Sequence, residues 1–220
     1  MEFKCSFCKT TEWDEMETFF CCKTCSTKLR NKKKKMRVLN VGSGNRPMPN
    51  DGLINTLKQT FDVCQPFMYY NTYANIDKDD GKYNIDLDDL KAKPLPFEDN
   101  SFDAIIMWHV FEHIDDVITL MEELYRVAKD DTVLYIACPW WQHAWAVGDI
   151  DHKRFINELT FNWFSKKFYE IQHKDSPCTP CRVRCNWEYD PSTNIYDHDK
   201  TGKANIYLAL TANKRRDIFE

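Results

Sequence analysis

Four cysteines near the N-terminus have the spacing of a metal site. They form two Cys-x2-Cys pairs separated by thirteen residues, and they are Cys5, Cys8, Cys22 and Cys25. Paired knuckles of this kind place four thiolates around a tetrahedral Zn²⁺ ion. A module of about 25 residues with few apolar side chains needs a bound metal ion to fold. We therefore predict a closed, structural zinc site.

Other interpretations of the cysteines fit the sequence less well. Cys21 could replace Cys22 as a ligand, but this would break the Cys-x2-Cys spacing. Disulfides would require export, and the N-terminus lacks the apolar core of a signal peptide. A second group of cysteines comprises Cys178, Cys181 and Cys185. Free thiols are the default interpretation of this group. The alternative is a second zinc site with His173 or His198 as its fourth ligand.

A Gly-x-Gly turn follows the first predicted strand, residues 37–41. Gly42 and Gly44 allow a ligand to approach the backbone closely, but Asn45-Arg46-Pro47 replaces the rest of the dinucleotide fingerprint. The missing third glycine counts against a nicotinamide dinucleotide with its pyrophosphate. It suits a ligand with a carboxylate near a helix N-terminus, such as S-adenosylmethionine.

Two aspartates end the next two predicted strands, residues 73–77 and 83–86. Asp77 is placed to accept hydrogen bonds from ribose hydroxyls, and Asp86 from an adenine amino group. Each carboxylate taken alone fits a loop cap equally well.

The segment 84–127 carries the most specific pattern. It contains Asn-Ile-Asp-Leu-Asp-Asp, Leu-Pro-Phe-Glu-Asp-Asn-Ser-Phe-Asp-Ala-Ile, His-Val-Phe-Glu-His-Ile and Glu-Glu-Leu-Tyr-Arg-Val. This run closely resembles class I S-adenosylmethionine-dependent methyltransferases of the type 11-like branch, and the resemblance spans most of residues 36–170. It implies a Rossmann-like fold, methyl transfer and S-adenosylmethionine as cofactor. The implied cofactor-binding residues are Val41, Gly42, Ser43, Gly44, Asp77 at the ribose, Asp86 and Leu87 at the adenine, and Trp108 and His109 facing the sulfonium and the acceptor.

The acceptor side is indicated by residues 148–156. This segment resembles the Asp-x-x-His-x-Arg-Phe loop that covers the active site in the same branch. The catalytic candidates are therefore His152, Asp149 and His109. A general base and a residue that only fixes the loop are equally good interpretations of His152. His113 is interpreted as structural, because an imidazole at the start of a helical turn can cap backbone groups.

Two other chemistries lose support. Cys138-Pro139 superficially resembles the nucleophile of RNA cytosine-C5 methyltransferases, but a buried thiol at a strand end is the better interpretation. The Trp-His-Val-Phe run also lacks the Asn/Asp-Pro-Pro-aromatic pattern that resembles adenine amino-methyltransferases.

The elements that must position these residues alternate as in an α/β domain. The run 102–108 is continuously apolar, which predicts a central strand covered on both faces. Helical spacing over 116–129 predicts a helix capped by Asp115 or Asp116. Further helices are expected over 51–61 and near 158–168, and further strands over 132–138, 183–189 and 204–212. The predicted fold is a doubly wound sheet, mostly parallel, with an antiparallel closing strand.

Length and composition agree with one main domain. The 220 residues are 43% hydrophobic with a net charge of −4, which excludes disordered and general polyanion-binding classes. We expect a zinc knuckle over 1–27, a basic linker over 28–35 and a methyltransferase domain over 36–220.

The expected partner is a small-molecule or sugar-type acceptor. A protein partner is possible through the knuckle, nucleic acid is disfavoured, and no membrane is expected. The expected location is cytoplasmic. The alternative functions are an adaptor on an inactive methyltransferase-like fold and methyl transfer to protein or nucleic acid.

Overall fold

The computed structural model describes residues 36–44, 47–61, 70–78, 83–175 and 183–215. The predicted zinc knuckle over 1–27, with its four cysteines, and the linker over 28–35 lie outside these residues. Cys178 and Cys181 also lie outside them.

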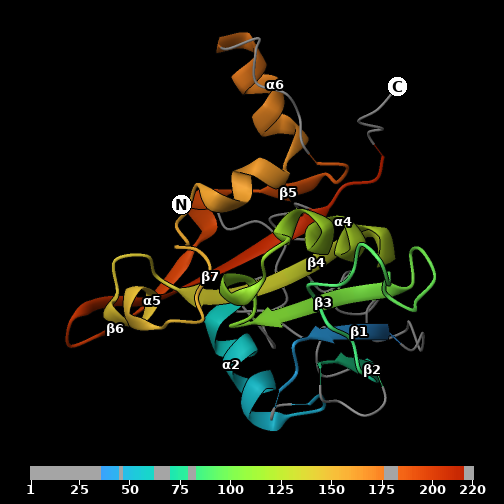
Figure 1. Cartoon of the computed structure of the whole chain (residues 1–220), viewed down its shortest axis with the longest axis horizontal. Coiled ribbons are helices and arrows are strands. Elements are labelled where there is room, and N and C mark those ends of the chain that lie inside the picture. The colour runs from blue at the N-terminus through green and yellow to red at the C-terminus, as the bar shows by residue number, and fades with distance from the viewer. Residues whose placement is uncertain (1–35, 45–46, 62–69, 79–82, 176–182, 216–220) are drawn as a thin grey trace, which may run out of the picture.

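A sheet of seven strands forms the centre of the described structure, in the order β2-β1-β3-β4-β7-β5, with β6 also paired to β7 (Figure 1). The first four are mutually parallel: β2 (Tyr70–Ile76), β1 (Met36–Val41), β3 (Phe102–Trp108) and β4 (Ala128–Pro139). Strand β7 (Gly202–Ala212) is antiparallel to β4, to β5 (Trp187–Tyr189) and to β6 (Ile195–Asp199). Because β7 alone runs against the other strands described, the expected mostly parallel sheet with an antiparallel closing strand is confirmed.

Strand β3 is buried on both faces of the sheet, as its apolar run predicts. Ile105 and Met107 point into the larger core, whereas Ala104 and Ile106 point into the smaller one. The alternation follows from the period of two in a strand. Each face therefore needs its own helical cover.

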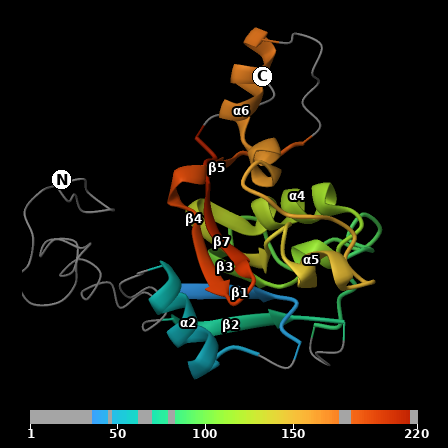
Figure 2. The same cartoon turned by 90° about the vertical axis from the view of Figure 1, so that its left-hand side faces the viewer.

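Two helices supply that cover from opposite sides of the sheet (Figure 2). Helix α4 (Val117–Val127) contributes Leu120, Met121, Leu124 and Val127 to the larger core. Helix α2 (Asp51–Phe61) adds Leu53 and Leu57 to the smaller core. The doubly wound arrangement expected from the sequence is thus present in the described part of the chain.

The remaining described elements lie after β3 and β4. A 3-10 turn, η1, spans Phe111–His113, and a short helix, α5, spans Ala144–Gly148. Two further 3-10 turns are η2 (Thr160–Phe164) and η3 (Pro191–Thr193). Helix α6 (Lys166–Asp175) extends away from the sheet in both views (Figures 1 and 2). Among the residues described, no helix combines the length and apolar character needed to cross a membrane.

The predicted strand over 83–86 is wrong. Within the described residues, this segment pairs with its neighbour through a single bridge, between Asp77 and Asn84. The carboxylate of Asp86 accepts a hydrogen bond from the backbone N–H of Asp88 at 3.1 Å. This side-chain turn competes with strand pairing, so Asp86 lies in a loop and not at a strand end.

Two other element predictions also need correction. The helix expected near 158–168 is divided, because Ser165 is extended between η2 and α6, and α6 begins where Lys166 N–H donates to Asn186 Oδ1 at 2.9 Å. Strand β6 was not expected. It forms a hairpin with β7, and the turn is closed by Asp199, whose side chain accepts from the N–H of Thr201 at 2.7 Å.

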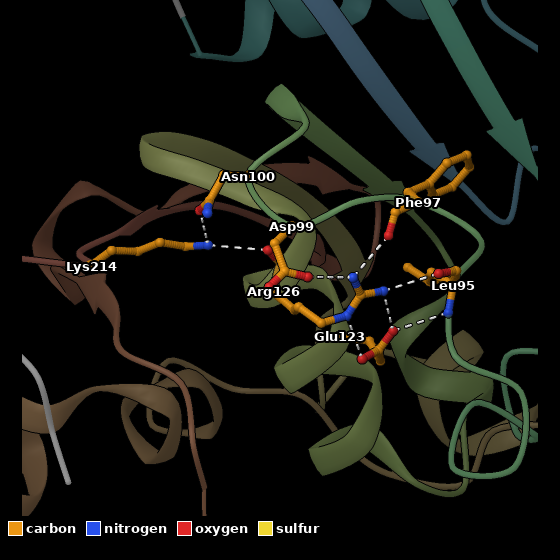
Figure 3. A network of polar contacts seen from close by, with 7 residues as sticks. All are labelled: Leu95, Phe97, Asp99, Asn100, Glu123, Arg126 and Lys214. Carbon is orange, nitrogen blue, oxygen red and sulfur yellow. Dashed lines mark hydrogen bonds and ion pairs between the residues drawn. The ribbon is translucent and has the colours of Figure 1, made fainter.

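Arg126 of α4 holds the Leu-Pro-Phe loop in place (Figure 3). Its guanidinium donates to the carbonyl oxygens of Leu95 and Phe97 at 3.0 and 2.8 Å, and to both oxygens of Glu123 at 2.9 Å. It also pairs with Asp99 at 2.7 Å. Arg126 therefore ties two parts of the family-like pattern, the loop before β3 and the Glu-Glu-Leu-Tyr-Arg-Val helix, to each other.

Candidate active site

The turn after β1 requires both of its glycines. Gly42 and Gly44 have φ angles of +62° and +47°, a region in which side chains other than glycine are strained. A Cβ on Gly42 would lie 2.4 Å from Cγ2 of Val110, whereas a Cβ on Gly44 would meet nothing within 4 Å. Gly42 is therefore packed against Val110, whereas Gly44 faces open space.

Asp77 lies directly beside this turn. It follows the last residue of β2, and its Oδ2 accepts a hydrogen bond from the backbone N–H of Gly44 at 2.7 Å. The N–H of Ser43 donates to the carbonyl of Ile76 at 3.1 Å, which fixes the turn against the end of β2. The structure therefore brings Asp77 and the glycine turn together at the carboxyl edge of the sheet.

Asp86 and Leu87 lie in the loop that follows. The side chain of Asp86 is about half exposed, and Lys78 Nζ lies 3.4 Å from its Oδ2. The hydrogen bond from Asp88 N–H, together with the charge of Lys78, lowers the pKa of Asp86 below its ordinary value. Leu87 is half-buried against the larger core. Asp86 thus remains an anionic acceptor.

Trp108 and His109 end β3 with different orientations. The Trp108 ring packs against the smaller core, and its centroid is 5.4 Å from that of Tyr207. His109 has a φ of +55° and a partly exposed ring, whose Nδ1 lies 3.3 Å from Glu112 Oε1. Of the two, His109 is the side chain that turns toward the segment after β3.

A cluster not anticipated from the sequence lies in that segment. Glu112, His113 and His152 each offer a nitrogen or oxygen atom, and these atoms all lie within 4.8 Å of one another. The ring centroids of His113 and His152 are 4.8 Å apart. The Glu-His pair was noticed only as part of the family-like pattern, and His113 was interpreted as a cap. What the sequence could not show is that His152 lies beside them.

Backbone contacts hold the 149–155 loop against η1. Lys153 N–H donates to the carbonyl of Glu112 at 2.7 Å. The guanidinium of Arg154 donates to the carbonyls of Ile114 and Asp115. Asp149 Oδ2 lies 3.7 Å from His152 Nε2, so the structure brings these two predicted catalytic residues together at the loop.

The aromatic residues of this region divide into buried and exposed groups. Trp140 is buried and packs edge-on against Tyr196. Trp145 is 73% exposed, and Ile150 is 94% exposed. An open hollow is lined by Ala144, Trp145, Gly148, Asp149 and Ile150. This hollow supplies apolar surface next to Asp149.

The two described thiols are core groups. Cys138 and Cys185 are both buried. Burial raises the pKa of the Cys138 thiol well above its ordinary value, and the nearby carboxylate of Glu112 raises it further. A thiol in this state is a poor nucleophile, which agrees with the prediction that Cys138 is not catalytic.

Comparison with known families decides the class of the protein. The profile of a methyltransferase domain family matches residues 15–170. The chain belongs to this methyltransferase family. The enzyme class expected from the sequence, an S-adenosylmethionine-dependent methyltransferase, is thereby confirmed. The edge of the methyltransferase sheet described above, where Gly42, Gly44 and Asp77 meet, is its candidate active site.

Solved structures of low identity resemble this methyltransferase. A methyltransferase from Archaeoglobus fulgidus, described as SAM-dependent, is 15% identical, with 84% of this chain and 90% of that chain covered and a TM-score of 0.45. The YcgJ protein of Bacillus subtilis is 14% identical, with 86% and 97% covered and a TM-score of 0.45. Phosphoethanolamine N-methyltransferase 2 of Haemonchus contortus, solved with S-adenosylmethionine, is 12% identical, with 86% and 51% covered and a TM-score of 0.44. At identities this low, the acceptor of a similar protein does not indicate the acceptor of this chain. No curated protein matches it significantly.

Proposed function

We propose that this methyltransferase binds S-adenosylmethionine at the carboxyl edge of β1, β2 and β3 and transfers its methyl group to a small-molecule acceptor. The observation that carries the proposal is the contact between Asp77 and the glycine turn. A carboxylate beside an open backbone turn at this edge is the arrangement that a nucleoside-containing ligand requires.

The residues present fit such a cofactor. Gly44 leaves open space above the turn, so a ligand can approach the backbone there. Asp77 can accept hydrogen bonds from ribose hydroxyls, and Asp86, held anionic by its contacts with Asp88 and Lys78, from the adenine amino group. Val41 and Ser43 complete the turn, Leu87 offers an apolar face to the adenine, and Trp108 and His109 mark the methyl end.

S-adenosylmethionine, when bound, supplies an activated methyl group that leaves by in-line displacement. The protein then has to align the acceptor, exclude water and control the proton of a hydroxyl or carboxyl acceptor. The groups available to hold or move the acceptor's proton are His109, Asp149 and His152. The exposed aromatic and apolar side chains around the hollow favour a small, partly apolar acceptor.

We also propose that Cys5, Cys8, Cys22 and Cys25 bind a structural Zn²⁺ ion in an N-terminal knuckle. Their spacing is the support for this proposal. The knuckle carries Glu12, Asp14, Glu15 and Glu17, so a protein surface suits it better than nucleic acid.

Calorimetry with S-adenosylmethionine tests the cofactor site. Asp77→Ala is expected to weaken binding by about 1–3 kcal/mol, because a charged, partly buried acceptor is lost. Asp89→Ala is the matched control: Asp89 lies in the neighbouring loop and pairs with Lys93 at 3.4 Å, and its loss should leave affinity unchanged. Equal affinities for wild type and Asp77→Ala would remove the proposed ribose site. A radioactive methyl donor added to cell extracts can then identify the acceptor.

A further inference from the structure

We propose that Glu112, His113 and His152 bind a divalent first-row transition-metal ion at the acceptor side of the active site. The inference rests on the proposed function only for the position of the acceptor. The three ligand atoms already lie within 4.8 Å of one another. Bonds of about 2.0–2.2 Å to such an ion need a tighter cluster, so the three side chains have to move toward one another when the ion binds.

The carboxylate of Glu112 is the first argument. Its side chain is only 1% exposed, and Oε2 has no hydrogen-bond partner. Oε1 lies 3.3 Å from Nδ1 of His109, and the thiol of Cys138 is a weak hydrogen-bond donor to the same carboxylate. A buried carboxylate is costly unless it is paired or coordinates a metal, and the neutral thiol of Cys138 supplies no charge, so Oε2 is the atom at which a metal ion would stabilise Glu112.

The two imidazoles are oriented as metal ligands are. His113 Nδ1 lies 3.3 Å from the carbonyl oxygen of Asp151, and His152 Nδ1 lies 3.1 Å from that of Ala146. A carbonyl oxygen only accepts, so these contacts favour the tautomer with the proton on Nδ1 and the lone pair on Nε2. Asp149 Oδ2 lies 3.7 Å from Nε2 of His152, so a second carboxylate faces the same nitrogen. Carbonyls that fix the tautomer in this way typically support metal-bound histidines.

Backbone hydrogen bonds bring the ligands together. Glu112 and His113 lie in η1, directly after β3, whereas His152 lies in the loop after α5. The hydrogen bonds from Lys153 and Arg154 to the segment 112–115 hold that loop in place. A site that is already assembled loses little conformational freedom when it binds an ion.

The donor set indicates the kind of ion. Two imidazoles and one carboxylate suit Zn²⁺, Mn²⁺ or Fe²⁺, whereas Ca²⁺ and Mg²⁺ prefer oxygen ligands. Three protein ligands leave coordination positions open for water or for an oxygen of the acceptor. An ion here would lower the pKa of a coordinated hydroxyl, so His152 would act on the acceptor's proton through the ion and not as a free base.

Titration with Mn²⁺ tests this site. Mn²⁺ is added to the full-length protein, prepared without added Zn²⁺ and free of S-adenosylmethionine and acceptor, and free Mn²⁺ is measured by electron paramagnetic resonance. Wild type should bind one Mn²⁺ ion per chain. Glu112→Gln, His113→Asn and His152→Asn should each weaken binding by about 10- to 100-fold or more. Glu170→Gln, at an exposed carboxylate of α6, is the control and should bind as wild type.

A melting curve provides the second measurement. Mn²⁺ should raise the melting temperature of wild type and of Glu170→Gln, but not that of Glu112→Gln. Without metal, Glu112→Gln should melt at or above the wild-type temperature, because a buried charge has been removed. If wild type binds no Mn²⁺, or if all three ligand variants bind it as wild type does, the proposal is wrong. Because the titration contains no cofactor, the result is independent of the calorimetry on Asp77.

Discussion

At the scale of single residues, Gly42 sets the shape of the cofactor turn. Its positive φ allows the chain to reverse after β1, and the missing side chain leaves room for Val110. Both features connect the end of β1 with the segment after β3, where His109 and Glu112 lie. The turn and the acceptor side therefore depend on each other through one glycine.

Gly42→Ala is expected to destabilise the protein by more than about 1–2 kcal/mol. The left-handed backbone strains a non-glycine residue, and the new Cβ would overlap Cγ2 of Val110. The free energy of unfolding in urea measures the effect. Gly148→Ala is the control, because its φ is not in the left-handed region and a Cβ there meets nothing within 4 Å. Equal losses for both variants would contradict this role for Val110.

At the scale of elements, α4 is defined by contacts at both of its ends. Asp116 caps the N-terminus, since its carboxylate accepts from the N–H of Thr119 at 3.0 Å and from its hydroxyl at 2.7 Å. This settles the choice between Asp115 and Asp116 as cap. Near the other end, Arg126 binds the 95–97 loop (Figure 3). The helix thereby connects the loop before β3 with the region of η1.

Asp116→Ala should cost about 1 kcal/mol of stability at pH 7, the usual value of an N-cap. The hydrogen bonds from the backbone and side chain of Thr119 lower the pKa of Asp116 in the folded state. Its charged form therefore stabilises the protein above the ordinary pKa of an aspartate, and this contribution is lost as the pH falls through the lowered value.

Urea unfolding at pH 7, 5 and 3 measures this dependence. The difference in stability between wild type and Asp116→Asn should shrink between pH 5 and pH 3, because the asparagine cap does not titrate. Asp115→Ala is the neighbouring control, with an exposed carboxylate whose removal should change stability by less than about 0.5 kcal/mol. A difference that stays constant with pH would argue against an ionised cap.

At the scale of the whole molecule, the chain combines the methyltransferase domain with the proposed zinc knuckle. The family profile begins at residue 15, before the first described strand. The knuckle therefore has to be tested on the full chain and not on a fragment.

Elemental analysis of Cys22→Ser/Cys25→Ser should show one zinc ion fewer per chain than wild type, because two of the four thiolates are lost. Cys21→Ser is the matched control and should keep its zinc. Should Cys21→Ser lose zinc instead, Cys21 and not Cys22 is the ligand. An unchanged zinc content in both variants would place the metal elsewhere.

Local signals were enough to predict much of the fold. The apolar run of β3, the helix over 51–61 and the capped helix α4 follow from periodicity and capping, which depend on neighbours in sequence. The candidate cofactor residues Gly42, Gly44 and Asp77 were also found in this way, since strand ends in a parallel sheet share one edge. The predictions for 83–86 and 158–168 were wrong because of side-chain hydrogen bonds. The hydrogen bond to Asp86 replaces strand pairing in the first segment, and the hydrogen bond to Asn186 accompanies the break of the expected helix in the second.

Only the tertiary structure placed His152 beside Glu112 and His113. These residues are far apart in sequence, and the tethers from Lys153 and Arg154 to η1 bring them together. It also decided that Trp140 is buried while Trp145 is exposed, although both lie in one Trp-rich segment. Burial and long-range contacts depend on which surfaces meet when the sheet and its loops pack, and no pattern of neighbouring residues contains that information.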